Sequence, residues 1–196
     1  MSLKKRLIIG ISGASGAVYG VRMLQMLKDV PVETHLVMSR AAEMTLAYET
    51  DLKAKDVQAL ADNVHSFGDV GAPIASGSFR TMGMVIAPCS VHSMAEIATG
   101  VTTNLLTRAA DVVLKERRRL VLMLRETPLH TGHLRNMTAL SEMGAIIAPP
   151  VPAFYARPRS VEDIVDHSIG RVLDLFGLDI GTVKRWGEPP DEATRS

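Results

Sequence analysis

Short runs of apolar residues alternate along the chain with longer stretches in which apolar positions recur every three or four residues. The short runs are continuous, which is typical of strands covered by helices on both faces. They predict strands at residues 7–11, 34–38, 84–87, 120–124 and 145–148. The longer stretches predict helices at residues 17–27, 41–48, 91–98, 104–117, 134–143 and 161–176. This alternation favours an α/β fold built around a parallel sheet.

Composition narrows the class of protein. The chain has 196 residues, of which 46% are hydrophobic and 22% charged, so it can bury a core as one globular domain. We expect that domain to cover residues 1–187, followed by a loose polar tail with two prolines at residues 188–196. The 22 Lys and Arg residues nearly balance the 21 Asp and Glu residues, which argues against a nucleic-acid partner.

The start of the chain and its cysteine content bear on location. The first apolar run is too short to span a bilayer, and glycines follow where a signal peptide needs a cleavage site. The one cysteine, Cys89, has no partner for an internal disulfide. We therefore expect a cytoplasmic protein without a membrane partner. A mean hydropathy of +0.13 and 11 methionines indicate either an oligomer or a methionine-rich core.

Candidate chemistry gathers after the predicted strands, where parallel α/β sheets bind ligands. Gly10, Gly13 and Gly16 form a GxxGxxG turn whose backbone N–H groups can approach an anion at a helix N-terminus, although a purely structural turn is an equal alternative. Serines at the next helix starts, Ser39 and residues 90–93, favour a flat anionic ligand held from several sides. The glycine spacing is not that of dinucleotide-binding folds, so a mononucleotide fits better than NADP bound through Arg40.

Other reactive side chains carry weaker signals. Ser15 is not a hydrolase nucleophile elbow, because Ala17 stands where that motif needs glycine. Cys89 near His92 is more typical of a buried filler than of a thiolate pair. His130 and His133 lack a carboxylate third ligand, so we expect no metal site. The basic run at residues 115–119 is mostly solvated surface in our interpretation, whereas the charged residues 125 and 126 follow a buried strand and favour a site over a structural ion pair.

Several motifs, taken together, resemble the UbiX/Pad family of flavin prenyltransferases over about residues 4–187. They are GISGASGA at 10–17 with YG at 19–20, ETD at 49–51, SGSF at 76–79, APCS at 87–90, RAADVVLKERR at 108–118, LRETPL at 124–129, HLRNM at 133–137, PAFYARP at 152–158 and RWG at 185–187. The short stretch between Asp51 and Ser76 looks like the bacterial branch associated with phenolic-acid decarboxylases. Two departures, Leu124 in place of a common proline and HTGHL at 130–134, touch no residue with a catalytic role.

The resemblance implies a flavodoxin-like or Rossmann-like three-layer α/β/α domain, assembled as a dodecamer with its sites at subunit interfaces. It implies that a dimethylallyl group from dimethylallyl phosphate is joined to N5 and C6 of reduced FMN, and that the prenylated FMN passes to a UbiD-type decarboxylase. The flavin would be held by Gly13, Ala14, Ser15, Ser39, Ser90, Val91, His92, Ser93 and Arg125. The prenyl phosphate would meet Lys115, Glu126, Tyr155 and Arg171, with Arg108 and Trp186 also near the site and Trp186 supplied by a neighbouring subunit as one possibility.

The chemistry of this reaction assigns roles to those residues. Loosening the C–O bond of an allylic phosphate leaves a departing anion, and losing one preorganised donor at a developing charge costs about 2.7–4 kcal/mol, against about 0.3–1 kcal/mol from a helix end. Lys115 and Arg171 should therefore drive ionisation, without a metal since no DDxxD motif is present. Ser15 and Glu49 would take the N5 proton, and Glu126 or the released phosphate the C6 proton. Tyr155 and Trp186 would shield the allyl cation.

Two rival functions stay open at this point. A flavin-dependent cysteine-peptide decarboxylase shares the glycine loop, but that class typically carries a PxxANT segment where this chain has PCSVHSM at residues 88–94. A non-catalytic flavin carrier for the partner decarboxylase is the other. Both would leave FMN without a prenyl group.

Overall fold

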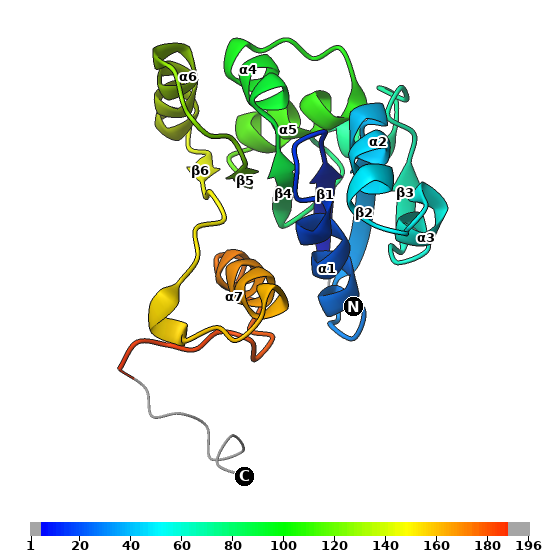
Figure 1. Ribbon diagram of the computed structural model, residues 1–196. Helices are drawn as coiled ribbons and strands as arrows, with labels where there is room; N and C mark the ends of the chain where they lie inside the picture. Colours follow the sequence, from blue (N-terminus) through cyan, green and yellow to red (C-terminus); the bar gives the residue numbers. More distant parts are fainter. Residues whose placement is uncertain (1–4, 188–196) are drawn as a thin grey trace. The chain divides into compact units, whose positions relative to one another are not determined.

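The computed structural model describes residues 5–187 (Figure 1). The predicted tail at residues 188–196 lies outside the described residues. The chain divides into two compact units, Met1–Pro149 and Pro150–Ser196, which we describe separately. The single-domain expectation stays a prediction.

A parallel sheet forms the centre of the first unit. Within the described residues it has six strands in the order β3-β2-β1-β4-β5-β6. These are β1 (Arg6–Ile11), β2 (Glu33–Met38), β3 (Asn63–His65), β4 (Gly83–Cys89), β5 (Arg119–Leu124) and β6 (Ile146–Ile147). The central strand β1 pairs along its whole length with β2, from Arg6↔Glu33 to Ile11↔Met38, and on its other side with β4. The predicted α/β class with a parallel sheet is confirmed.

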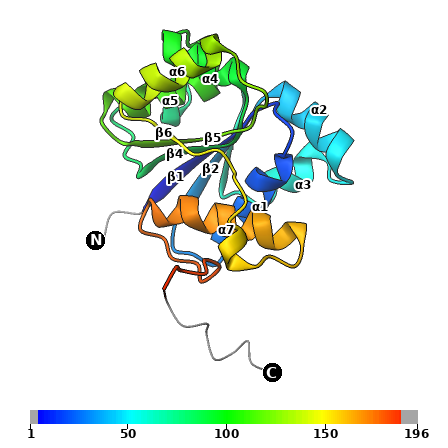
Figure 2. The same cartoon turned by 60° about the vertical axis from the view of Figure 1, so that its left-hand side comes forward.

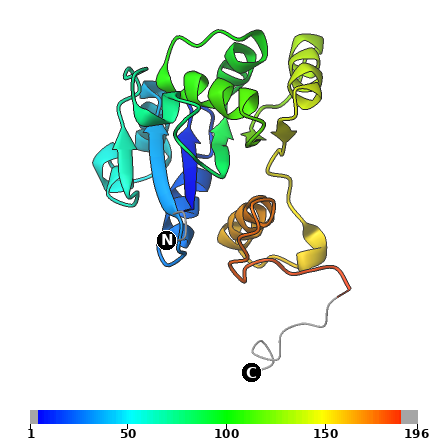
Figure 3. The same cartoon turned by 180° about the vertical axis from the view of Figure 1, so that it is seen from behind.

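Helices cover both faces of this sheet. On one face α1 (Ala17–Leu27) packs against β1 and β4, with α2 (Arg40–Glu49) beside it. The other face carries α4 (Val91–Thr99), α5 (Leu105–Lys115) and α6 (Thr131–Glu142), as Figure 2 shows. Seen from behind in Figure 3, the cyan segment with the short helix α3 (Ala54–Gln58) and β3 lies at the sheet edge next to β2. A 3₁₀ turn, η1 (Pro73–Ala75), packs against α5.

The core follows from the continuous apolar strands. Every residue of β4 is buried, and Leu36, Ile86 and Leu122 are completely inaccessible to solvent. Gly20 lets α1 approach β4 closely, because a Cβ atom there would lie 2.4 Å from the carbonyl oxygen of Ala87. The two-sided covering explains why these strands lack the alternation of polar and apolar residues.

The structure confirms the five predicted strands and six predicted helices with small shifts in their ends, and adds β3 and α3. The largest shift is in α6, which begins at Thr131 instead of residue 134. Nδ1 of His130 accepts hydrogen bonds from the N–H groups of Gly132 and His133, so an imidazole acts as the N-cap where a hydroxyl or carboxylate is usual.

The second unit contains η2 (Phe154–Ala156) and α7 (Val161–Asp174). Helix α7 begins as its sequence predicts, since the Ser160 hydroxyl accepts a hydrogen bond from the N–H of Asp163 at 3.1 Å. Gly177 follows the helix with a φ of +68°, the conformation that favours glycine at a helix end. Over residues 5–187, no helix combines the length and the apolar character needed to cross a membrane.

Candidate active site

Hydrogen bonds join neighbouring strand ends at the carboxyl edge of the sheet. The Ser39 N–H donates to the Ile11 carbonyl at 3.0 Å, which ties the end of β2 to that of β1. The Arg125 N–H donates to the Cys89 carbonyl at 3.0 Å and ties β5 to β4. The order of the strands reverses at β1, since the chain continues to β2 on one side of it and later to β4 on the other. Such a topological switch point is where open α/β sheets bind their ligands.

Ser12 links the two central strands and is a residue that sequence reasoning missed. Its side chain is buried, donates a hydrogen bond to the Pro88 carbonyl at 2.9 Å and accepts one from the Ser90 N–H at 2.7 Å. The hydroxyl therefore fixes the spacing between the loop after β1 and the loop after β4. A serine directly after the apolar run at residues 7–11 is the signal that could have pointed to it.

Two of the predicted serines are helix N-caps. The Ser39 hydroxyl accepts a hydrogen bond from the Ala42 N–H at 3.0 Å, and the Ser90 hydroxyl accepts one from the Ser93 N–H at 3.2 Å. Ser93 is buried and its hydroxyl accepts a second bond from that of Ser90, also at 3.2 Å. In a helix the first N–H groups have no carbonyl partner within the helix, so the starts of α2 and α4 present donors to an anion at this edge.

The N-terminus of α1 is closed by a side chain of the protein itself. The Glu49 carboxylate, at the end of α2, accepts hydrogen bonds from the N–H groups of Gly16, at 2.9 and 3.1 Å, and Ala17, at 3.0 Å. A protein carboxylate therefore occupies these two N–H groups, which agrees with the structural alternative for the start of α1, and flavin binding by Gly13, Ala14 and Ser15 stays a prediction. Gly10 also lies within β1 and not in the loop, while Gly13 approaches α2 so closely that a Cβ would lie 2.3 Å from that of Ala41.

Ser15 and Glu49 form a hydrogen-bonded pair at the mouth of this edge. Burial alone raises the pKa of Glu49, but the hydrogen bonds from the Ser15 hydroxyl and the two backbone N–H groups, with the positive charge of Arg125, outweigh it and lower the pKa below its ordinary value. Arg125 follows β5 and faces Tyr19 as well, whose pKa is raised by burial against the opposing effect of Arg125. The structure thus brings together Ser15, Glu49 and Arg125, three of the predicted residues.

This cluster has a definite chemical capability. Glu49 is ionised at neutral pH and can only accept hydrogen bonds, so the Ser15 hydroxyl hydrogen points toward it. The lone pairs of Ser15 are then available to an N–H donor of a bound ligand. A proton arriving at the Ser15 oxygen can pass on to Glu49 as the hydroxyl hydrogen is released. Arg125 supplies a cation for an anionic or electron-rich ring system.

The remaining predicted flavin contacts surround the same loops. Ala14 is buried and Gly13 half-buried, beside Ser15. Val91 is half-buried in the first turn of α4, and His92 is exposed, with its Nδ1 3.8 Å from a Glu96 carboxylate oxygen. Cys89 is wholly buried, and burial raises its pKa to about 12, so the thiol stays protonated and the filler interpretation agrees with the geometry.

Several residues predicted to lie near the prenyl phosphate are elsewhere in the first unit. Lys115 ends α5, four residues before the start of β5, and thus belongs to the amino edge of the sheet, opposite Ser15. Its ammonium group pairs with Glu116. Arg108, in the first turn of α5, pairs with Asp111 at 3.0 Å. Glu126 is exposed after β5 and accepts a hydrogen bond from the Thr127 N–H at 2.9 Å.

Four of the five residues in the basic run at 115–119 are exposed, as expected, and Arg118 is the exception. The side chain of Arg118 is only 17% exposed, and its guanidinium donates to the carbonyl oxygens of Gly77 and Phe79, each at 2.6 Å. It holds the SGSF segment against the end of α5. This structural role corrects the surface interpretation for Arg118.

The second unit holds the remaining predicted residues. The Tyr155 and Trp186 rings meet edge to face, with centroids 5.6 Å apart and planes at 85°. Arg171 is exposed on α7 and pairs with Asp174 at 2.9 Å. Asp174 is also held by Arg185, through two hydrogen bonds of 3.0 Å each. An exposed aromatic pair is available to shield a cation, and the exposed Arg171 is available to an anion.

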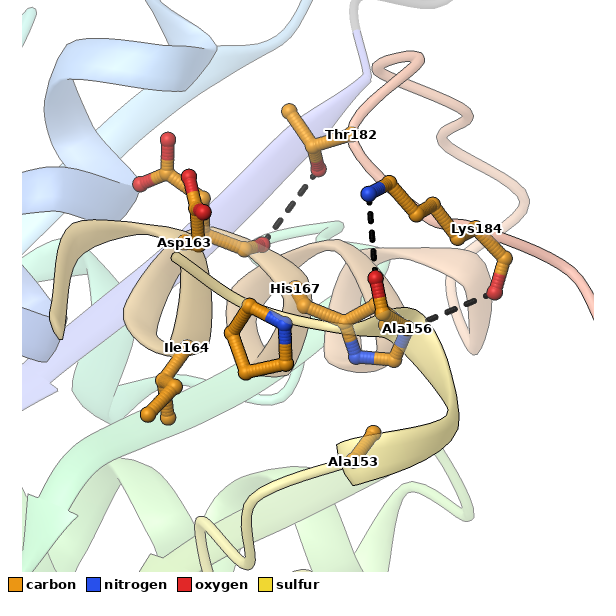
Figure 4. Close-up of a pocket in the computed structure, with 9 residues that line it drawn as sticks. Ala153, Ala156, Asp163, Ile164, His167, Thr182 and Lys184 are labelled. Atoms are coloured by element: carbon orange, nitrogen blue, oxygen red, sulfur yellow. Dashed lines mark hydrogen bonds between the residues drawn. The ribbon is translucent and has the colours of Figure 1, made fainter. Parts of the chain in front are cut away.

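Two hollows lie outside this cluster. One of about 680 Å³ is bordered by the end of β3 and the start of α2, with Arg40, Glu43 and His65 among its lining residues. The other, of about 240 Å³, lies within the second unit between η2, α7 and the segment with Thr182 and Lys184 (Figure 4).

Comparison with known proteins defines the class. Residues 1–173 match the model of the Flavoprotein family. The crystal structure of AnUbiX (PadA1) in complex with FMN and dimethylallyl pyrophosphate has a TM-score of 0.93 at 51% identity, covering 96% of this chain and all of that one. A dodecameric FMN-dependent Ubix-like decarboxylase from Escherichia coli O157:H7 has a TM-score of 0.91 at 54% identity, covering 93% and 100%. The chain is thus a flavoprotein of the three-layer α/β/α class, as predicted.

Within that class, the chain is most informatively compared with the flavin prenyltransferases. The chain is 61% identical to the flavin prenyltransferase UbiX of Escherichia coli (strain K12) over 177 residues, which cover 90% of this chain and 94% of that protein. It belongs to the UbiX family of flavin prenyltransferases, which confirms the resemblance and the transferase class. The narrower branch associated with phenolic-acid decarboxylases stays a prediction.

The rival decarboxylase class shares only the fold. The FMN-dependent cysteine decarboxylase TvaF from thioviridamide biosynthesis has a TM-score of 0.60 at 18% identity, covering 76% of this chain and 91% of that one. Identity at this level supports a common architecture and no common reaction.

Proposed function

We propose that this flavin prenyltransferase joins the dimethylallyl group of dimethylallyl phosphate to N5 and C6 of reduced FMN and releases inorganic phosphate. The prenylated FMN then passes to a UbiD-type decarboxylase. The Ser15–Glu49 pair carries the proposal, because it presents a hydrogen-bond acceptor backed by an ionised carboxylate at the carboxyl edge of the sheet. A reduced flavin carries an N–H at N5 that such an acceptor suits.

The protein residues have separate tasks in this proposal. The donors at the starts of α2 and α4, behind Ser39 and Ser90, hold the FMN phosphate, and Arg125 faces the flavin ring. Ser15 accepts the N5 hydrogen and Glu49 receives the proton that Ser15 releases. The bond to C6 forms as the double bond of the transferred dimethylallyl group takes up a proton, and Glu126 or the departing phosphate takes the proton that leaves C6.

Prenyl transfer also needs groups that receive the phosphate and shield the cation. We assign the phosphate to Lys115, Arg171, Tyr155 and Arg108, and the apolar wall to the rings of Tyr155 and Trp186. Since Lys115 lies at the opposite edge of the sheet from Ser15, the Lys115 that serves a given site comes from a neighbouring copy. That placement agrees with a dodecamer, the assembly of the Escherichia coli O157:H7 relative.

One mass measurement tests the reaction. The purified protein is incubated anaerobically with reduced FMN and dimethylallyl phosphate, and the flavin is analysed by mass spectrometry. The expected product has gained one C₅H₈ unit. Unaltered FMN that remains bound would support a carrier instead, and turnover of a peptidyl-cysteine without any prenyl donor would support the decarboxylase. Dimethylallyl pyrophosphate, which the AnUbiX structure contains, is the second donor to compare.

We also propose a cytoplasmic location, since the chain holds one cysteine and the described residues contain no helix able to span a membrane. Fractionation of the native host with an antibody against the protein tests it.

A further inference from the structure

Tyr155 has a buried neighbour that the proposed mechanism does not use. His167, in the middle of α7, is 7% exposed, and its ring meets the Tyr155 ring edge to face at 5.7 Å. Its Nε2 lies 3.4 Å from the Tyr155 hydroxyl oxygen. The imidazole therefore contacts both the ring and the hydroxyl group of a residue assigned to the prenyl phosphate.

A second contact determines which atom carries the hydrogen. Nε2 of His167 also lies 3.5 Å from the Lys184 carbonyl oxygen. A carbonyl oxygen can only accept, so this contact favours a hydrogen on Nε2. With that hydrogen shared between the Lys184 carbonyl and the Tyr155 oxygen, the tyrosine accepts from His167 and keeps its own hydroxyl hydrogen free for another acceptor.

The Lys184 carbonyl is itself held in place. The Lys184 ammonium donates to the Ala156 carbonyl at 3.0 Å, and the Thr182 hydroxyl donates to the Asp166 carbonyl at 3.3 Å. Figure 4 shows these two bonds together with the contact between the His167 ring and the Lys184 carbonyl. Gly170 allows the close approach of this segment to α7, because a Cβ there would lie 2.5 Å from the Thr182 hydroxyl oxygen.

We propose that His167 is a positioning residue, which orients the Tyr155 hydroxyl so that its hydrogen points toward the phosphate of the prenyl donor. The inference rests on the proposed function and deepens it. An unoriented tyrosine would divide its hydroxyl hydrogen between the imidazole and the donor. The fixed Nε2–H donor removes that competition, and the same contact sets the ring angle at which Tyr155 packs on Trp186.

The test compares three variants of α7 in the full-length protein. His167→Leu replaces the imidazole, and with it the N–H donor, by an apolar side chain. We expect the KM for dimethylallyl phosphate to rise about tenfold with a smaller change in kcat. His167→Gln restores an N–H donor and should return the KM to within about threefold of the wild-type value. Ser168→Ala, which alters only a bond to the Ile164 carbonyl in the same helix, is the matched control and should leave the KM unchanged.

Two further measurements separate positioning from mere stability. The chain has one tryptophan, so the emission of Trp186 reports on the Tyr155 cluster without any catalysis, and we expect it to shift in His167→Leu and not in Ser168→Ala. In a double-mutant cycle, adding His167→Leu to Tyr155→Phe should raise the KM no further, because the hydroxyl that His167 orients is gone.

The outcomes distinguish failure of the proposed prenyl transfer from failure of the positioning role of His167. A wild-type protein that forms no prenylated flavin would overturn the proposed function itself. An active wild type whose KM is unaffected by His167→Leu, or additive effects of the two substitutions, would overturn the positioning role and leave the prenyl transfer standing.

Discussion

Glu49 performs two tasks that a single carboxylate combines. It closes the N-terminus of α1 through the N–H groups of Gly16 and Ala17, and it accepts the hydroxyl hydrogen of Ser15. The backbone bonds fix the carboxylate in one orientation and hold it ionised. A base with a lowered pKa is weak, but it is always ready to receive a proton at neutral pH and needs no reorientation.

Replacing this carboxylate tests its role in proton transfer. In Glu49→Gln the side chain turns one of its oxygens into an amide NH₂ that cannot accept, so we expect the rate of prenyl transfer at saturating substrates to fall about a hundredfold. Single-turnover formation of prenylated FMN measures it. Glu43→Gln, an exposed change on the same helix, is the control and should keep the wild-type rate. Full activity of Glu49→Gln would remove Glu49 from the proton path.

The candidate site was predictable in part at the scale of residues. Ser15, Glu49 and Arg125 were expected from their motifs and lie together, and the serines at helix starts follow directly from N-cap chemistry. That Glu49 occupies the end of α1 could not be predicted, because it joins residues that lie 33 positions apart. Arg118 was misjudged for the same reason: its carbonyl partners lie about 40 positions earlier, and a basic run by itself indicates only solvent.

At the scale of elements, Ser12 holds β1 to β4. Ser12→Ala leaves the Ser90 N–H without its acceptor and removes the hydrogen bond from the hydroxyl to the Pro88 carbonyl. The loss should lower the free energy of unfolding by about 1–3 kcal/mol. It should also weaken FMN binding, since the loops after both strands would separate. Urea unfolding and a flavin titration measure the two effects. Ser141→Ala on the exposed side of α6 should change neither, and equal stability of Ser12→Ala would contradict the linking role.

The sheet edge at β3 was not predicted. Its three residues, Asn63–His65, are too short and too polar for hydrophobic periodicity to reveal. Tertiary contacts form it instead: Nδ1 of His35 on β2 lies 3.0 Å from Nε2 of His65, and Nε2 of His35 lies 3.1 Å from Glu33. The five other strands were predictable because burial on two faces leaves a continuous apolar run.

This histidine pair makes stability depend on pH. Burial lowers the pKa of both His35 and His65 below their ordinary value of about 6.5, with the neighbouring imidazole adding to the effect on His35. Below pH 6.5 the unfolded chain therefore binds more protons than the folded one. Stability should be highest above about pH 6.5 and fall as the pH drops through the lowered pKa values.

Urea unfolding at a series of pH values from 7.5 to about 5 measures this slope. His65→Gln removes one of the two groups and should flatten it. His92→Gln, whose imidazole is 80% exposed, serves as the control and should follow the wild-type curve. An identical slope in the His65 variant would show that the acid sensitivity comes from other groups.

At the scale of the whole molecule, the leaving phosphate must be stabilised either by cationic side chains or by a bound metal ion. The arginine and lysine candidates provide the cationic donors that a phosphate requires, so we expect activity without a divalent cation. Treatment of the purified enzyme with EDTA, followed by removal of the chelator, should leave prenyl transfer within about twofold of the untreated rate. Loss of activity that magnesium restores would contradict this expectation.

Assembly determines whether Lys115 can serve a site. Helix α2 exposes Met44 and Tyr48, at 61% and 86%, on one side, since residues four apart share a helix face. A charged side chain there should oppose the covering of that face by another copy. We expect wild-type protein to have twelve times the 21.2 kDa chain mass in native mass spectrometry, and Tyr48→Asp to form smaller species with reduced prenyl transfer. Glu142→Ala on the exposed side of α6 is the control and should keep the full mass.

Flavin affinity must be measured in the same variant, because Glu49 follows Tyr48 directly and the substitution could disturb it. Smaller species that bind FMN normally and have lost prenyl transfer would show that the contacts to the prenyl donor come from a neighbouring copy. Fully active single chains would mean that one chain supplies the whole site.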